Sequence, residues 1–91
     1  MNSQEMVERG RNHTALRTEL DRQGPLFVQE RELLLDAADA LLFDEPEGDV
    51  RRQEAMDLLE ALEANERRTE GEVSRLGTAL VGCGDAVPAT A

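Results

Sequence analysis

The feature that most constrains this chain is a ladder of residues spaced seven apart that continues across a Gly-Pro pair. Such spacing is typical of helices that pack lengthwise against a partner helix. Gly24 and Pro25 fall between two rungs, yet the rungs on either side stay in phase. The spacing therefore predicts helix on both sides of the pair. The rungs are Met6, His13, Leu20, Phe27, Leu34 and Leu41.

The Gly24-Pro25 pair either bends one helix or separates two. Proline in a helix interior removes a backbone donor and crowds an earlier carbonyl, which costs about 3 kcal/mol. Gly24 relieves part of the clash that proline imposes on the preceding residue, because glycine has no Cβ. We interpret the pair as a kink within one helix over about residues 3–43. The alternative is a break, which gives a three-helix bundle.

A second ladder, with alternating spacings of four and three, predicts a helix over about residues 50–81. Residues 44–49 form the turn between the two helices, and residues 82–91 are expected to be a flexible tail. Folding the chain at this turn pairs Leu34 with Leu59 and Leu20 with Val73, so that the two ladders coincide. The expected fold is therefore all-α: a single domain over residues 1–81, formed by an antiparallel, coiled-coil-like two-helix hairpin.

The segment over residues 33–43 is apolar around more of the helix than one partner can cover. Leu35 and Leu42 point away from the seam that contains Leu34 and Leu41. A helix that is apolar over more than one stripe is buried by more than one neighbour. We therefore expect two hairpins to pair near their tips as a homodimeric four-helix bundle. The predicted interface residues are Leu34, Leu35, Leu41, Leu42, Leu58, Leu59 and Leu62.

Composition restricts the partners. The formal net charge is -10, which argues against binding to nucleic acid or to anionic membranes and favours basic protein partners. The chain has one cysteine and therefore no internal disulfide. It has neither an apolar run of about 20 residues nor a secretory signal pattern at its start. We expect a cytoplasmic protein that does not bind membranes.

His13 is the residue with the clearest potential for chemistry. The stretch NHTALRTEL over residues 12–20 resembles the phosphoacceptor box of sensor histidine kinases. Asn12-His13 and Leu16-Arg17-Thr18 match the box, whereas Thr14 and Glu19 replace its acid and its proline. One additional residue separates the histidine from the leucine. The resemblance implies a dimerising helical hairpin that is phosphorylated on His13.

Other chemistry lacks the residues it requires. We find no pattern for a phosphate-binding loop, a nucleophile elbow or a paired acid–base site, and we predict neither an enzyme nor a cofactor. His13 and Cys83 approach one another in the predicted hairpin, but a zinc site requires three or four ligands. The acidic turn at residues 44–49 has Ala55 where a calcium loop of the EF-hand type requires an acid. No metal site is expected.

Two classes of function remain. We expect a non-enzymatic protein–protein interaction module, an adaptor or a chaperone-like protein that acts as a homodimer. Small acidic export chaperones of flagellar and type III secretion systems are similar to this chain in size and expected helix content. The alternative is a small signalling or regulatory module that acts through histidine phosphotransfer at His13.

Overall fold

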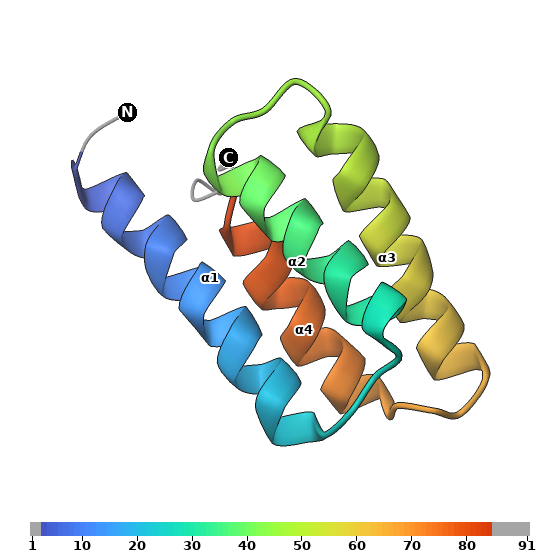
Figure 1. Ribbon diagram of the computed structural model, residues 1–91. Coiled ribbons are helices and arrows are strands. Elements are labelled where there is room, and N and C mark those ends of the chain that lie inside the picture. Colours follow the sequence, from blue (N-terminus) through green and yellow to red (C-terminus); the bar gives the residue numbers. More distant parts are fainter. Residues whose placement is uncertain (1–2, 85–91) are drawn as a thin grey trace.

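The computed structural model describes residues 3–84, in which the regular secondary structure is entirely α-helical. Four helices follow one another, each antiparallel to the next (Figure 1). The predicted all-α class is confirmed, but the described chain forms four helices rather than two or three. Their bounds are α1 Ser3–Gln23, α2 Val28–Leu42, α3 Gly48–Ala64 and α4 Glu70–Gly82.

The predicted kink at Gly24-Pro25 is wrong, because α1 ends at Gln23 and a loop separates it from α2. Gly24 has a φ of +96°, a left-handed conformation that glycine adopts without steric cost and that ends a right-handed helix. Pro25 lies in the loop, where no helical hydrogen bond requires its missing N–H. The Glu30 carboxylate then accepts a hydrogen bond from the backbone N–H of Phe27 at 3.1 Å, which caps the start of α2.

A second break divides the helix that was predicted over about residues 50–81. After α3, Glu66 has a φ of +58°, and the backbone N–H of Arg67 returns to the carbonyl of Leu62 at 2.9 Å. This hydrogen bond is that of a Schellman motif, which terminates helices. Thr69 and Glu72 then form a capping box for α4, with reciprocal hydrogen bonds of 3.2 and 2.8 Å. The three-helix alternative is therefore also wrong, since it kept this helix whole.

The turn predicted at residues 44–49 is present, although α3 already begins at Gly48. Asp44 adopts the left-handed region with a φ of +53°. The backbone N–H of Glu45 returns to the carbonyl of Ala40 at 2.9 Å, so α2 ends in the same way as α3. This turn keeps α2 and α3 adjacent and antiparallel (Figure 1).

The segments that were predicted to pair in the hairpin also pack against each other in the four-helix bundle. The most extensive contacts join α1 with α4 and α2 with α3, the same pairs that the register of the two ladders predicted. The breaks additionally bring α2 against α1 and α4, and α3 against α4. A single helix over residues 3–43 would be about 60 Å long, whereas the longest dimension of the molecule is 39 Å.

The core lies where the four helices meet, and it accounts for the apolar excess of the segment over residues 33–43. α2 contacts three other helices of its own chain, so most of its broad apolar surface is covered within one chain, although Phe43 remains 66% exposed. The four-helix bundle that was expected from two chains is formed by one chain. The fully buried side chains are Leu16, Leu34, Leu59, Leu62, Leu76, Leu80 and Cys83.

Two consecutive arginines tie the two unpredicted loops together. Arg68 donates hydrogen bonds to the carbonyls of Gly24 and Pro25, each at 3.2 Å. Arg67 makes a bidentate pair with Glu30 at 2.7 and 2.8 Å, and its guanidinium lies 4.8 Å from the centre of the Phe27 ring. A bidentate arginine–carboxylate pair such as that of Arg67 with Glu30 is stronger than a single hydrogen bond. Together with the hydrogen bonds of Arg68, it joins the loop between α1 and α2 to the loop between α3 and α4.

The structure describes only residues 82–84 of the tail that was predicted over residues 82–91. Gly82 is the last residue of α4, and Cys83 is fully buried. Residues 85–91 lie outside the described residues.

Candidate functional site

An apolar concavity lies between α3 and α4; we call it the α3–α4 groove. It has a volume of about 450 Å³. Val73, Gly77 and Val81 follow one another at four-residue intervals and therefore lie on one face of α4. The full lining is Met56 from α3 and Val73, Ser74, Gly77, Thr78 and Val81 from α4.

Gly77 lines the groove where α4 packs against α3. It is buried, and a Cβ added to it would lie 3.7 Å from both the Leu59 Cδ1 and the Met56 Cε atoms. That distance is ordinary van der Waals contact, so a small side chain would fit without forcing the helices apart. Glycine inside a helix costs about 0.5–1 kcal/mol relative to alanine. Gly77 therefore lowers the stability of α4 at the position where the groove is formed.

The end of the groove next to the loop between α3 and α4 is acidic. We call Glu60, Glu63, Glu66 and Glu70 the acidic end; all four are exposed. Among the described residues, none of them has an ion-pair partner. The nearby Arg67 and Arg68 instead bind Glu30 and the carbonyl of Gly24, at the connection between α1 and α2. Arg67 and Arg68 line one concavity with Glu63, Glu66 and Glu70, but they form no ion pair with these glutamates.

His13 lies in a separate concavity between α1 and α2, which we call the α1–α2 notch. Its volume is about 200 Å³, and it is lined by His13, Arg17, Arg31, Leu35 and Asp39. The Nε2 atom of His13 lies 2.7 Å from Oδ1 of Asp39. Because an ionised carboxylate only accepts hydrogen bonds, Nε2 is the donor in this hydrogen bond. The His13 side chain is 18% exposed, so it is accessible but not free to rotate.

Cys83 does not join His13 in a metal site. The thiol is buried and donates a hydrogen bond to the Ala79 carbonyl at 3.4 Å. Burial, with a smaller contribution from the negative charge of Asp39, raises the pKa of Cys83 to about 11. A cysteine binds metal as the thiolate, which this environment disfavours. Within residues 3–84 no three His, Cys, Asp or Glu side chains gather as metal ligands would.

The predicted interface leucines divide between the core and its edge. Leu34, Leu41, Leu59 and Leu62 are buried within one chain. Leu35 and Leu58 are half-buried and pack against the core, and Leu42 is also half-buried. Four of the seven residues are thus unavailable for contact with a second chain while the bundle stays folded.

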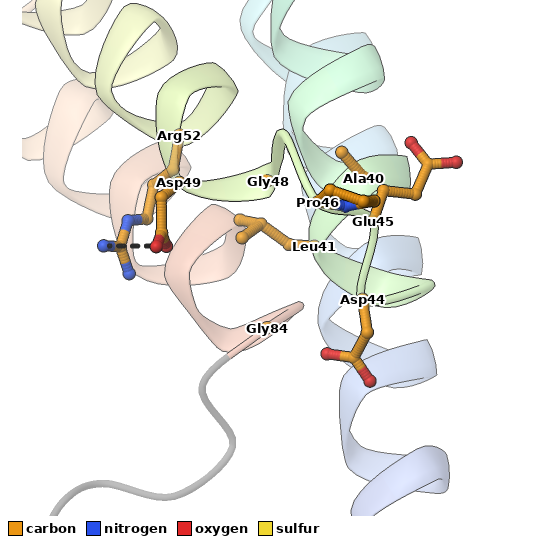
Figure 2. A pocket seen from close by; sticks show the side chains of 9 residues that line it. All are labelled: Ala40, Leu41, Asp44, Glu45, Pro46, Gly48, Asp49, Arg52 and Gly84. Atoms are coloured by element: carbon orange, nitrogen blue, oxygen red, sulfur yellow. Dashed lines mark ion pairs between the residues drawn. The ribbon is translucent and has the colours of Figure 1, made fainter.

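The acidic turn borders a third concavity, shown in Figure 2, of about 320 Å³. Leu41 points into it, whereas the carboxylates of Asp44 and Glu45 point in different directions (Figure 2). Asp44 pairs with Arg9 at 3.2 Å. The carboxylates of the acidic turn therefore do not converge on a common point. The pocket also contains Ala40, Pro46, Gly48, Gly84 and the ion pair of Asp49 with Arg52 at 3.5 Å.

Comparisons with protein-family profiles, with curated proteins and with solved structures find no match to this chain. The described helices include none that combines the length and the apolar character needed to cross a membrane.

Neither the α3–α4 groove nor the α1–α2 notch was predicted, because each depends on a chain reversal that is absent from the predicted hairpin. The α3–α4 groove exists only where the predicted second helix breaks, and the α1–α2 notch only where the first one does. A signal for the former was present: Thr69 and Glu72 have the spacing of a capping box. Asp39, the partner of His13, lies 26 residues away in the sequence, and no local pattern connects the two.

Proposed function

We propose that this protein is a non-enzymatic interaction module that binds an amphipathic helix of a partner protein in the α3–α4 groove. The observation that carries the proposal is the open apolar concavity that one face of α4 forms with Met56 of α3, with the buried Gly77 in its lining. An amphipathic helix presents apolar side chains every three or four residues and fits such a channel lengthwise. Val73, Gly77 and Val81 offer matching positions along α4.

The charge around the groove favours a basic partner. The acidic end carries four carboxylates without ion-pair partners among the described residues, and the whole chain has a net charge of -10. Complementary charge accelerates association and excludes partners of like charge. We therefore propose that the partner helix carries lysine or arginine residues near the end that lies over Glu63 and Glu70.

The same charge disfavours a second copy of this chain as the occupant of the groove. Two copies meeting through the α3–α4 groove would bring two acidic ends into one interface, and like charges there are destabilising. The homodimer expected from the sequence remains a prediction. Its original reason, uncovered leucines on the segment over residues 33–43, is met in part within one chain, since Leu35 and Leu42 are half-buried there. The proposed binding requires only a single bundle.

Site-specific photo-crosslinking tests the proposal. A photoreactive amino acid placed at Thr78 in the groove is expected to yield a discrete adduct in the cells that make the protein. Mass spectrometry of the adduct should map it to a helical, net-positive segment of the partner. The same amino acid at Thr14, which is exposed on α1, serves as the control. An adduct with another copy of this chain, an equally strong adduct from Thr14, or no adduct would reject the proposal.

A matched pair of glycine substitutions separates binding from folding. Gly77→Ala and Gly10→Ala should each stabilise the isolated protein by about 0.5–1 kcal/mol, because both replace glycine inside a helix. Gly10 has no heavy atom within 4 Å of an added Cβ and lies on α1, outside the groove. Only Gly77→Ala should reduce the yield of the Thr78 adduct. Equal yields from the two variants would mean that the groove is not the binding surface.

A second candidate function is supported by the hydrogen bond between His13 and Asp39. With Nε2 donating to the carboxylate, the lone pair on Nδ1 can attack a phosphoryl group, and Asp39 stabilises the positive charge that the ring gains. Phosphoramidate is a direct probe, because its P–N bond breaks as ammonia leaves and a new P–N bond forms at His13. Acid-labile phosphate on the wild type and none on His13→Gln would support this function. Equal labelling of the two proteins, or none of either, would exclude it.

A further inference from the structure

The interface between α1 and α2 contains a ladder of polar pairs in addition to its apolar contacts. Three rungs are occupied: Arg9 with Asp44 at 3.2 Å, His13 with Asp39 at 2.7 Å, and Asp21 with Arg31 at 2.9 Å. The α1 members of these pairs are separated by multiples of four residues, so they follow one side of the helix.

One rung of this ladder is vacant. Arg17 lies four residues after His13 and four before Asp21, yet it has no ion-pair or hydrogen-bond partner among residues 3–84. The α2 residue that lines the notch beside it is Leu35, which offers no charge. The α1–α2 notch is located at this rung. An arginine without an acid thus borders a concavity that contains a second arginine and a histidine.

We infer that the α1–α2 notch binds an oxyanion group, a phosphate or a carboxylate, that occupies the vacant rung beside Arg17. Arginine presents planar N–H groups that match the oxygens of phosphate and carboxylate. The notch of about 200 Å³ has room for such a group, since one water accounts for about 30 Å³. This site is on the opposite helix pair from the α3–α4 groove and is independent of it.

Two features oppose anion binding and set its strength. Asp39 borders the notch, but its Oδ1 is engaged by His13 at 2.7 Å. The net charge of -10 repels anions at long range, although physiological salt screens charges beyond about 8 Å. Arg31 is paired with Asp21, so Arg17 supplies the positive charge in the notch that no ion pair takes up. Because Arg17 is exposed, we expect a dissociation constant on the order of 1 mM for a free ion.

Titration with inorganic phosphate, followed by NMR at pH 7 and constant ionic strength, tests the inference. The side-chain Nε–H signal of Arg17 and the ring signals of His13 should shift in a saturable way. Arg17→Gln should weaken binding at least tenfold. Arg51→Gln is the matched control, because Arg51 is exposed on α3, lies outside the notch and also has no ion pair within residues 3–84. Shifts that grow linearly without saturation, or equal binding by Arg17→Gln, would overturn the inference.

Parallel titrations with acetate and with capped phosphoserine identify the source of the oxyanion. Tighter binding of capped phosphoserine than of inorganic phosphate would indicate that the group belongs to a partner side chain, and the reverse would indicate a free ion. Each result supports the site only if Arg17→Gln weakens that binding at least tenfold. Gly77→Ala should leave all three titrations unchanged, so the outcome is separate from that of the helix-binding proposal.

Discussion

At the scale of single residues, Glu19 binds three side chains, and one of them, Arg75, connects α1 with α4. Its carboxylate accepts hydrogen bonds from Arg22 at 2.6 Å, from Gln23 at 2.8 Å and from Arg75 of α4 at 3.0 Å. The hydrogen bonds from Arg22, then Gln23 and then Arg75 lower the pKa of Glu19 from 4.5 to about 2. Donors that bind the charged form of a carboxyl group favour ionisation, which links this contact to folding.

Glu19→Gln should therefore destabilise the bundle, by about 1–2 kcal/mol at neutral pH, because it removes charge-assisted hydrogen bonds. The lowered pKa of Glu19 means that its stabilisation is present above pH 4.5 and is lost as the pH falls towards about 2. Urea unfolding of the two proteins should show a difference that shrinks over this range. Glu54→Gln on α3 is the control, since Glu54 is exposed and has no ion pair within the described residues. A constant difference between pH 7 and pH 2 would contradict this role of Glu19.

Cys83 should react slowly with thiol reagents in the native protein. Its pKa is raised from 9.0 to about 11 by burial and by Asp39, so the reactive thiolate is scarce at pH 8. The reaction with a disulfide reagent at pH 8 should be at least about a hundredfold slower in buffer than in urea. Because the folded form retains the thiol proton, the stability of the bundle should also fall as the pH rises from 9 towards 11. Equal rates in buffer and urea would show that Cys83 is not in the core.

At the scale of the helices, periodicity identified helical segments but not where they end. The ladder crosses Gly24-Pro25 in phase, yet its rung Phe27 is 66% exposed and its first rung Met6 is 43% exposed. Only Leu20, Leu34 and Leu41 among the rungs are buried. The agreement in phase across the pair was therefore a coincidence of spacing. Periodicity reports which face of a helix is apolar and contains no information on backbone dihedral angles.

The break after α1 gives opposite expectations for two glycines. Gly24→Ala should destabilise the protein by about 1–2 kcal/mol, because its φ of +96° is unfavourable for residues with a Cβ. Gly10→Ala, inside α1, should instead stabilise it by about 0.5–1 kcal/mol. Thermal or urea unfolding measures both. Stabilisation by Gly24→Ala would mean that the residue is helical and that α1 continues through it.

At the scale of the whole molecule, the sequence predicted which helix segments pair but not that the hairpin folds in half. Leu34 with Leu59, and Leu20 with Val73, were assigned to pairs of segments that do pack together, because helix register depends on apolar spacing that the sequence displays. The fold-back depends on two short loops and on Arg67 and Arg68, which reach residues more than 35 positions away. The same holds for the sites. His13 was identified as a candidate from its residue type, whereas the α1–α2 notch that contains it and the α3–α4 groove exist only because the hairpin folds back.

The distance between the start of α1 and the turn after α2 distinguishes the four-helix bundle from a continuous helix most directly. Arg9 and Asp44 are paired at 3.2 Å in the bundle, whereas a continuous helix would hold these levels about 50 Å apart. Spin labels at Arg11 and Glu47, both exposed, with Cys83 replaced by alanine, allow this distance to be measured by pulsed electron paramagnetic resonance. The bundle predicts a single distribution below about 25 Å, within the width of a small helical bundle and two label arms. A distribution centred near 50 Å would show that α1 and α2 form one long helix and would contradict the four-helix bundle.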